Sequence, residues 1–230
     1  RQMCIRDRLY DVEDSVKLAA WVGTEFTGNL LVIMCDGPQG LVDYETAAIA
    51  ALCERAGGTS LGSSVGETWW AEKYEPYVPG KLPQPPVLYG TFDTVARYRD
   101  VPRIYEAKKK IIEEQFSEYG AKYTAHFSHW WDWGTMIYDR FWIETAPDDP
   151  NEALALHDRL WEAGVMTSLD LGGTVNEHHG VGLKLGRFMR PQYGAAFDLL
   201  LDLKRAWDPK GIMNPGKLGF GPPLGQRLIR

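Results

Sequence analysis

The segment from Lys122 to Glu144 limits the possible folds more than any other part of the chain. Two runs rich in aromatic and branched residues, 122–131 and 135–144, flank the short sequence Asp132-Trp133-Gly134. Such runs around a glycine-containing turn predict a β-hairpin. A hairpin joins two antiparallel strands, so the fold must contain at least one antiparallel pair.

The two faces of the second hairpin strand differ in character. Side chains alternate along a strand, so one face carries Ile137, Asp139, Phe141 and Ile143, and the other carries Met136, Tyr138, Arg140, Trp142 and Glu144. We expect the first face to lie under helices. The second offers a phenol, a guanidinium and an indole, and we expect it to line a pocket for a flat cofactor and a small substrate. Arg140, together with His129 on the first strand, is assigned to substrate binding.

The remaining elements follow from hydrophobic periodicity and from capping residues. Strands are predicted at 30–34, 87–95 and 167–171, and the continuous apolar run 30–34 is expected to be buried on both faces. Helices are predicted at 11–22, 42–56, 101–119, 152–163 and 193–207, with a further helix start at 63–67. Gly57, Gly120 and Gly164 are expected to end helices. This order predicts an α+β fold with a mixed or antiparallel sheet that helices cover on one face.

A glycine-flanked loop carries the residues best suited to proton transfer. It reads Glu177-His178-His179-Gly180-Val181-Gly182, and the segment Asp208 to Lys217 follows after a helical run. Glycine lets the backbone approach a ligand closely, and imidazoles exchange protons near neutral pH. A metal site built from these histidines with His126 and His129 is a weaker interpretation, because adjacent histidines do not easily share one tetrahedral ion. We predict no metal.

The loop and the tail together resemble the C-terminal signature of FAD-linked oxidases of the vanillyl-alcohol-oxidase / p-cresol-methylhydroxylase superfamily. In the tail, the matching residues are Asp208-Pro209, Ile212 and Asn214-Pro215-Gly216-Lys217. The loop is most similar to the triple-histidine form found in alkyl-dihydroxyacetonephosphate synthases. The resemblance implies a ferredoxin-like substrate (cap) domain, FAD as cofactor, and a separate N-terminal domain that binds the flavin.

The resemblance also implies roles for single residues. The segment His126 to Tyr138 is similar to a hairpin of the synthases in which a tyrosine is the acid/base, and that tyrosine falls on Tyr138. His178 and His179 align with two loop histidines and are expected to be catalytic with it. Four further residues, namely Glu177, Gly180, Asn214 and Lys217, are expected to contact the cofactor.

The sequence departs from that of the synthases in two ways, one that concerns the substrate and one that concerns the domains present. The synthases carry an arginine for the substrate phosphate, whereas Pro79-Gly80-Lys81 has only a lysine, a point charge without the bidentate fork. Lys81 is therefore a substrate-binding candidate. We expect residues 9–170 to form the cap domain, 171–230 to face the flavin, and 1–8 to be a non-native leader. The N-terminal FAD-binding domain is expected to be missing, which would make the chain a fragment.

Composition restricts the partners. The net charge of −6 argues against nucleic acid. Three isolated cysteines form no disulfide framework and favour a reducing, cytoplasmic setting. No apolar run reaches the roughly 18 residues that a membrane span needs. The expected partners are a small-molecule substrate and the missing domain, and the oligomeric state is left open.

We therefore predict the C-terminal part of an FAD-dependent oxidoreductase that oxidises a small alcohol or 2-hydroxy acid by hydride transfer to flavin. Two alternatives stay open: an alkylglycerone-phosphate-synthase-like transferase and a non-catalytic ferredoxin-like binding module.

Overall fold

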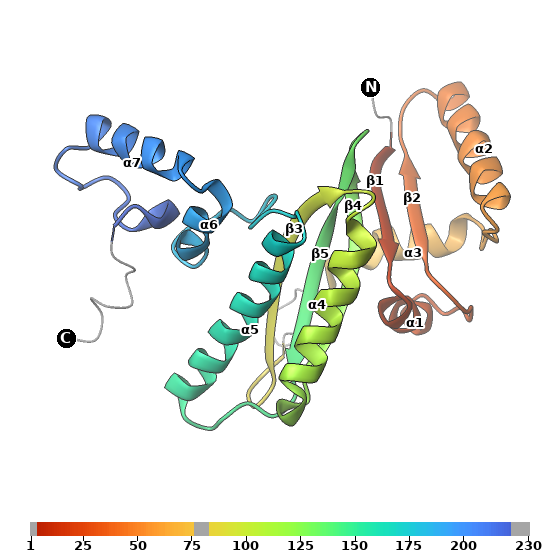
Figure 1. Ribbon diagram of the computed structural model, residues 1–230. Helices are drawn as coiled ribbons and strands as arrows, with labels where there is room; N and C mark the ends of the chain where they lie inside the picture. The colour runs from red at the N-terminus through yellow and green to blue at the C-terminus, as the bar shows by residue number, and fades with distance from the viewer. Residues whose placement is uncertain (1–3, 76–82, 222–230) are drawn as a thin grey trace. The chain divides into compact units, whose positions relative to one another are not determined.

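The computed structural model describes residues 4–75 and 83–221 and has an α+β fold, as predicted. Five strands form one sheet in the order β2-β1-β4-β5-β3, and the pairs β1–β2, β1–β4 and β3–β5 are antiparallel (Figure 1). The chain divides into two compact units, one of residues 1–84 with 124–129 and one of residues 85–123 with 130–230. The strand β4 (Lys122–Trp130) contributes to both units.

In the described residues, the first unit contains two further strands and three α-helices. They are β1 (Cys4–Tyr10), α1 (Val12–Trp21), β2 (Leu31–Cys35), α2 (Gln39–Arg55) and α3 (Ser63–Glu72). Asp11 caps α1, because its carboxylate accepts the Asp14 N–H at 2.9 Å. The same carboxylate accepts the Ala125 N–H at 2.7 Å, so it also fixes β4 to the start of α1.

Two features of this unit were not foreseen. Strand β1 includes residues 4–8, which belong to the segment expected to be a leader. Their non-native origin is a separate matter and stays a prediction, as does the functional division at residue 170. Strand β2 was expected to be buried on both faces, but Leu31 is 41% exposed and Val32 is 5% exposed. Only the Val32 side packs into a core, with Tyr10, Leu30 and Trp69.

The second unit places helices over the β3–β5 part of the sheet. Its elements are β3 (Leu88–Arg97), α4 (Val101–Gln115), η2 (Ser117–Tyr119), β5 (Gly134–Ile143), α5 (Pro150–Asp170), η3 (Gly186–Phe188), α6 (Met189–Tyr193), α7 (Ala196–Trp207) and η4 (Lys217–Gly219). The register of β3 and β5 runs from Leu88 opposite Ile143 to Arg97 opposite Gly134. Helices α4 and α5 pack together and against these strands (Figure 1).

The predicted helix-covered face of β5 is confirmed. Ile137, Phe141 and Ile143 are fully buried, and Ile104 and Ile112 of α4 are buried with them. Each such side chain contributes roughly 1.5–3 kcal/mol relative to an exposed one. The opposite face is half-buried at Tyr138, Arg140 and Trp142, although Met136 at its end is buried and not open as expected.

Helix α5 corrects two predictions. It continues to Asp170, so Gly164 does not end a helix and no strand forms at 167–171. A Cβ on Gly164 would lie 2.3 Å from Cζ of Phe92. The absence of a side chain at Gly164 therefore allows α5 to pack closely against β3. The last predicted helix is also divided, because Gly194 has φ 53° between α6 and α7.

Candidate functional site

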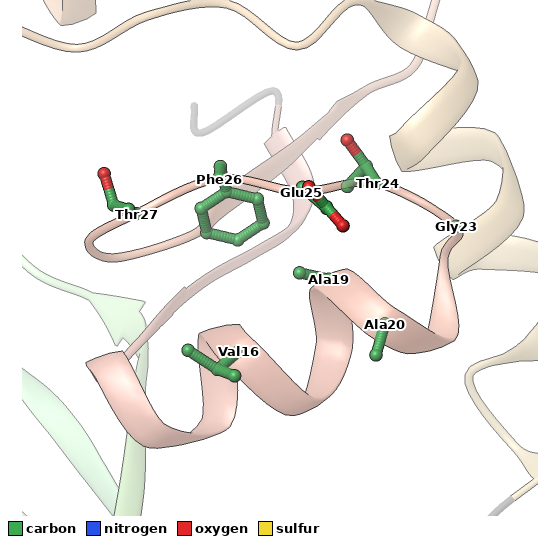
Figure 2. A pocket seen from close by; sticks show the side chains of 8 residues that line it. All are labelled: Val16, Ala19, Ala20, Gly23, Thr24, Glu25, Phe26 and Thr27. Atoms are coloured by element: carbon green, nitrogen blue, oxygen red, sulfur yellow. The ribbon is translucent and has the colours of Figure 1, made fainter.

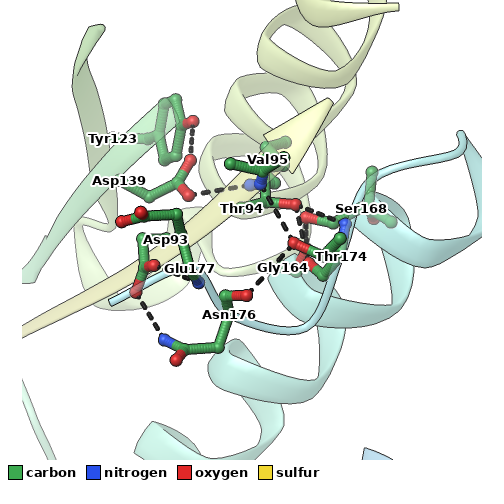
Figure 3. Close-up of polar contacts among 12 residues, drawn as sticks. Asp93, Thr94, Val95, Tyr123, Asp139, Gly164, Ser168, Thr174, Asn176 and Glu177 are labelled. Carbon is green, nitrogen blue, oxygen red and sulfur yellow. Dashed lines mark hydrogen bonds and ion pairs between the residues drawn. The ribbon is translucent and has the colours of Figure 1, made fainter. Parts of the chain in front are cut away.

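The loop that follows α5 is fixed to strand β3 through two threonines. The Thr94 hydroxyl donates to the Thr174 carbonyl at 2.6 Å and accepts the Thr174 N–H at 2.8 Å. The Val95 N–H donates to the Thr174 hydroxyl at 3.0 Å (Figure 3). Gly173 permits this approach, since a Cβ there would lie 2.6 Å from the Thr94 hydroxyl oxygen. The loop therefore begins from a defined position on the sheet.

Asp93, the neighbour of Thr94, binds the next part of the loop. Its side chain is buried, with the whole residue 1% exposed, and its carboxylate accepts the Asn176 side-chain N–H at 2.7 Å. It also accepts the backbone N–H of Glu177 at 2.5 Å and that of His178 at 3.0 Å, and Figure 3 shows Asp93 beside Asn176 and Glu177. Asn176 in turn accepts the Gly180 N–H at 2.7 Å. One buried carboxylate thus sets the backbone on which both histidines are carried.

The two imidazoles lie against Tyr138 and against acidic side chains. Ring centroids of Tyr138 are 5.7 Å from His178 and 5.1 Å from His179, and the two imidazoles are 4.2 Å apart. Nδ1 of His179 is 2.5 Å from Oδ1 of Asp93, and Nδ1 of His178 is 2.6 Å from Oε2 of Glu177. Asp93 stands opposite Tyr138 in the β3–β5 register, so these two residues share a face of the sheet.

The other predicted site residues lie in different parts of the chain. Arg140 lies two positions after Tyr138 on the same face of β5 and is half-buried. Asn214 (φ 47°) and Lys217 are exposed in the tail. Beside them, the Leu218 N–H donates to the Gly182 carbonyl at 3.0 Å, which joins the tail to the loop. His129 belongs to the first unit, so its proximity to Tyr138 stays a prediction, and Lys81 lies outside the described residues.

Sequence reasoning missed Asp93 and Asn176. The sequence did contain a signal for Asp93, because this aspartate stands inside a predicted strand with apolar neighbours. A carboxylate in such a place is buried only when other groups hydrogen-bond to it, so partners for Asp93 could have been expected. Its partners, however, lie 83–85 residues away in the sequence. Sequence reasoning also missed Lys108 of α4, which is buried and pairs with Asp139 at 2.7 Å. Burial raises the pKa of Asp139 to about 6 and lowers the pKa of Lys108.

Asp93, His178 and His179 also bring three ligand-type atoms within 4.8 Å of one another. The Asp93 oxygens, however, already accept N–H groups of the loop, and each Nδ1 already faces a carboxylate. A metal ion would have to displace these contacts. We therefore assign this cluster to hydrogen bonding.

An open hollow of about 990 Å³ lies in the first unit, between α1 and residues 23–27. Figure 2 shows Val16, Ala19 and Ala20 of α1 on one side, and the segment that carries Glu25 and Phe26 on the other. Its lining holds no histidine, tyrosine or arginine, and none of the predicted site residues. The chemistry-bearing residues are instead gathered around Asp93.

Comparisons with known proteins identify the family of the chain. Residues 5–218 match the family profile described as FAD linked oxidases, C-terminal domain. The chain is 29% identical over 199 residues to alkyldihydroxyacetonephosphate synthase of Trypanosoma brucei brucei, covering 85% of this chain and 32% of that protein. It is 25% identical over 235 residues to the uncharacterized FAD-linked oxidoreductase YgcU of Escherichia coli K12, covering 92% of this chain and 45% of that protein.

Solved structures share the fold. An alkyldihydroxyacetonephosphate synthase matches with a TM-score of 0.64 and 19% identity, covering 94% of this chain and 40% of that one. A p-cresol methylhydroxylase matches with a TM-score of 0.60 and 15% identity, covering 94% and 46%. Within residues 4–75 and 83–221, no helix is both long and apolar enough to cross a membrane. The chain spans a third to just under a half of these relatives, and it belongs to the family of FAD-linked oxidases, whose C-terminal domain it forms.

Proposed function

We propose that the chain is the substrate-binding domain of an FAD-dependent oxidoreductase that oxidises a small alcohol or 2-hydroxy acid. The observation that carries the proposal is the convergence of Tyr138, His178 and His179 on one face of the sheet. FAD, when bound, supplies the acceptor for the hydride that leaves the substrate carbon. The chain's own residues must then remove the hydroxyl proton.

The exposed side of this cluster suits the flat ring of a flavin. The His178 and His179 side chains are 36% and 31% exposed, so their rings are accessible from one side. Gly180 has φ 82° and no atom within 4 Å of where a Cβ would stand, which leaves its backbone open to a ligand. Glu177, Gly180, Asn214 and Lys217 are the residues that we propose to hold the cofactor.

Tyr138 and the imidazoles are proposed to handle the proton of the substrate hydroxyl. A neutral imidazole can accept this proton directly, and Tyr138 can accept it when its own hydroxyl proton passes to an imidazole. Positioned acid/base groups accelerate proton transfer by about 10²–10⁴-fold. Arg140, on the same face as Tyr138, offers a guanidinium that could bind a carboxylate with two parallel hydrogen bonds. This supports a 2-hydroxy acid as substrate. D-lactate dehydrogenase 1 of Saccharomyces cerevisiae is 33% identical over 86 residues, or 37% of this chain and 14% of that protein.

An exposed apolar face on α7 supports the presence of a larger protein around this domain. Leu199, Leu203 and Trp207 recur every four residues and are 68%, 49% and 80% exposed. Such a stripe on a surface helix marks a contact surface. We propose that the FAD-binding domain expected N-terminal to this one covers it.

The experiment is a single-turnover measurement of flavin reduction in the FAD-loaded enzyme that carries this domain. Tyr138→Phe and His178→Ala should each lower the rate with a 2-hydroxy acid by about 10²-fold. Arg140→Met should instead raise the substrate concentration needed for half-maximal reduction. Unchanged reduction in both Tyr138→Phe and His178→Ala would refute the site assignment.

A second candidate function is a redox-neutral transferase similar to alkyldihydroxyacetonephosphate synthase. The likeness to the Trypanosoma brucei brucei protein and the paired histidines favour it. The two candidates differ in electron balance. An oxidoreductase consumes one equivalent of electron acceptor per turnover, whereas such a transferase consumes none, so acceptor consumption during product formation separates them.

A further inference from the structure

We propose that Asp93 and Glu177 lock both loop histidines in the tautomer with hydrogen on Nδ1, which leaves Nε2 of each imidazole as the proton acceptor. In this arrangement Asp93 is a positioning residue for His179, and Glu177 is a positioning residue for His178. The catalytic use of the two Nε2 atoms rests on the proposed function. The tautomers themselves do not.

The first step of the argument is the chemistry of the donors and acceptors. An ionised carboxylate can only accept hydrogen bonds. Nδ1 of His179 lies 2.5 Å from Asp93 Oδ1, and Nδ1 of His178 lies 2.6 Å from Glu177 Oε2. Each Nδ1 must therefore carry the hydrogen. A neutral imidazole has only one N–H, so Nε2 is the unprotonated nitrogen of each ring.

The second step is that Asp93 cannot easily turn away. It is buried on β3, and three donors from the loop already bind its carboxylate: the Asn176 side chain and the Glu177 and His178 backbones. An oxygen fixed in this way fixes the imidazole that it binds. Glu177 has a side chain that is 17% exposed and sits on the loop itself. His179 should therefore be held more rigidly than His178.

The third step connects the tautomer to the reaction. The two nitrogens of an imidazole point in different directions, so when Nδ1 donates to a carboxylate, Nε2 is the nitrogen that can accept a proton. Tyr138 is the neighbouring acid/base group, with its ring centroid 5.1 Å from that of His179. When the substrate O–H bond breaks, its electron pair stays on oxygen and forms the carbonyl bond as the C–H bond breaks. The proton adds to Nε2, directly or through Tyr138, and FAD, when bound, would accept the hydride that leaves the carbon. The imidazolium formed then donates from Nδ1 to the Asp93 carboxylate.

The direct test is nitrogen-15 NMR of histidine side chains in the full 230-residue chain, at a pH where the imidazoles are neutral. We expect His178 and His179 to show the Nδ1–H pattern. In Asp93→Asn, His179 should change to a mixture of tautomers, while Glu177→Gln should change His178 alone. Asp198→Asn, an exposed carboxylate of α7 paired with Arg190, is the matched control and should change neither.

Two NMR outcomes would overturn the inference. One is an Nε2–H pattern for His179 in the unaltered chain, and the other is an unchanged pattern in Asp93→Asn. Bound zinc at one equivalent, found by elemental analysis, would do the same, because a metal on Nδ1 excludes hydrogen there. If Asp93→Asn does not fold, Glu177→Gln and its effect on His178 still decide the question, since Glu177 is partly exposed.

A second measurement separates this inference from the proposed function. In the FAD-loaded enzyme, Asp93→Asn should lower flavin reduction by roughly 10-fold or more with little change in half-saturation, as expected for a residue that orients a proton acceptor. If the tautomers change as expected but flavin reduction does not, the positioning is right and the proposed function is wrong.

Discussion

Lys108 of α4 and Asp139 of β5 form an ion pair with 2.7 Å between Nζ and Oδ2, and neither side chain is exposed to solvent. The Tyr123 hydroxyl donates to the other oxygen of the same carboxylate. The pair lies on the helix-covered side of the sheet, whereas Tyr138, the residue before Asp139, lies on the other side. A charged pair is thus enclosed directly behind the residues of the candidate site.

Removing one partner of this pair should cost much more than removing both. Lys108→Met leaves the Asp139 carboxylate buried without its counter-charge, so we expect the free energy of unfolding to fall by about 3–5 kcal/mol. The double variant Lys108→Met with Asp139→Asn should recover a large part of that loss. Urea unfolding of the single and double variants measures the difference. Lys110→Met, an exposed change on the same helix, should stay within about 0.5 kcal/mol. Equal losses in the single and double variants would contradict the prediction.

Gly164 offers a second test of how α5 meets the sheet. Alanine favours helix over glycine by about 1 kcal/mol. At position 164, however, its Cβ would lie 2.3 Å from the Phe92 ring. We expect Gly164→Ala to lower the free energy of unfolding by about 1–3 kcal/mol, because the ring cannot move out of a filled core. Gly66→Ala in α3 is the matched control, since nothing lies within 4 Å of its Cβ, and it should raise stability. If both changes raise the free energy of unfolding, the Phe92 ring moves aside and the prediction for Gly164→Ala is wrong.

Gly164 also illustrates where sequence reasoning reaches its limit. Alternation along 135–144 correctly placed Asp139 and Phe141 on the covered face, because that pattern depends only on the strand itself. The reason for a glycine in the middle of α5 is the Phe92 ring on another element, and no local pattern contains that information. The predicted helix end at Gly164 and the predicted strand at 167–171 were wrong for this reason.

The candidate site divides in the same way. The glycine-flanked loop indicated His178 and His179, and the strand pattern placed Tyr138 on the open face, where the family resemblance singled it out. The structure brings the three together. Their catalytic roles stay predictions. Asp93 could not be connected to them, because it lies 85 residues before His178 and its partners include backbone N–H groups, which leave no trace in side-chain composition.

His157, a residue of α5, should make the free energy of unfolding depend on pH. Burial lowers the pKa of His157 to about 4, and the charge of Lys184 adds to the effect. The unfolded chain, with the usual histidine value near 6.5, therefore binds more protons than the folded chain between pH 6.5 and about 4. Stability contributed by neutral His157 is full above pH 6.5 and is lost as the pH falls through this window. In His157→Gln, the free energy of unfolding should fall less between pH 7 and pH 4.5. Parallel pH curves for the two proteins would contradict this.

Asp139 contributes in the opposite direction over part of the same range. Its pKa is raised to about 6, so the folded chain binds more protons than the unfolded chain between pH 6 and the usual value near 4. This group therefore adds to stability as the pH falls. The His157 variant must be compared with the unaltered chain at each pH, because that difference cancels the Asp139 contribution common to both.

The hydrogen bonds of Thr94 make the histidine loop a part of the sheet, which leads to the last prediction. Thr94→Val keeps the shape of the side chain but removes the hydroxyl that donates to the Thr174 carbonyl and accepts the Thr174 N–H. Both loop groups lose a partner, so we expect stability to fall by about 1–3 kcal/mol. Amide hydrogen exchange at Thr174 and at the following loop residues should become faster. Thr167→Val is the matched control, because its hydroxyl bonds only within α5, to the Ala163 carbonyl at 2.7 Å. If the loop amides exchange at the same rate in Thr94→Val and Thr167→Val, Asp93 alone holds the loop, and the threonine pair is dispensable for the placement of His178 and His179.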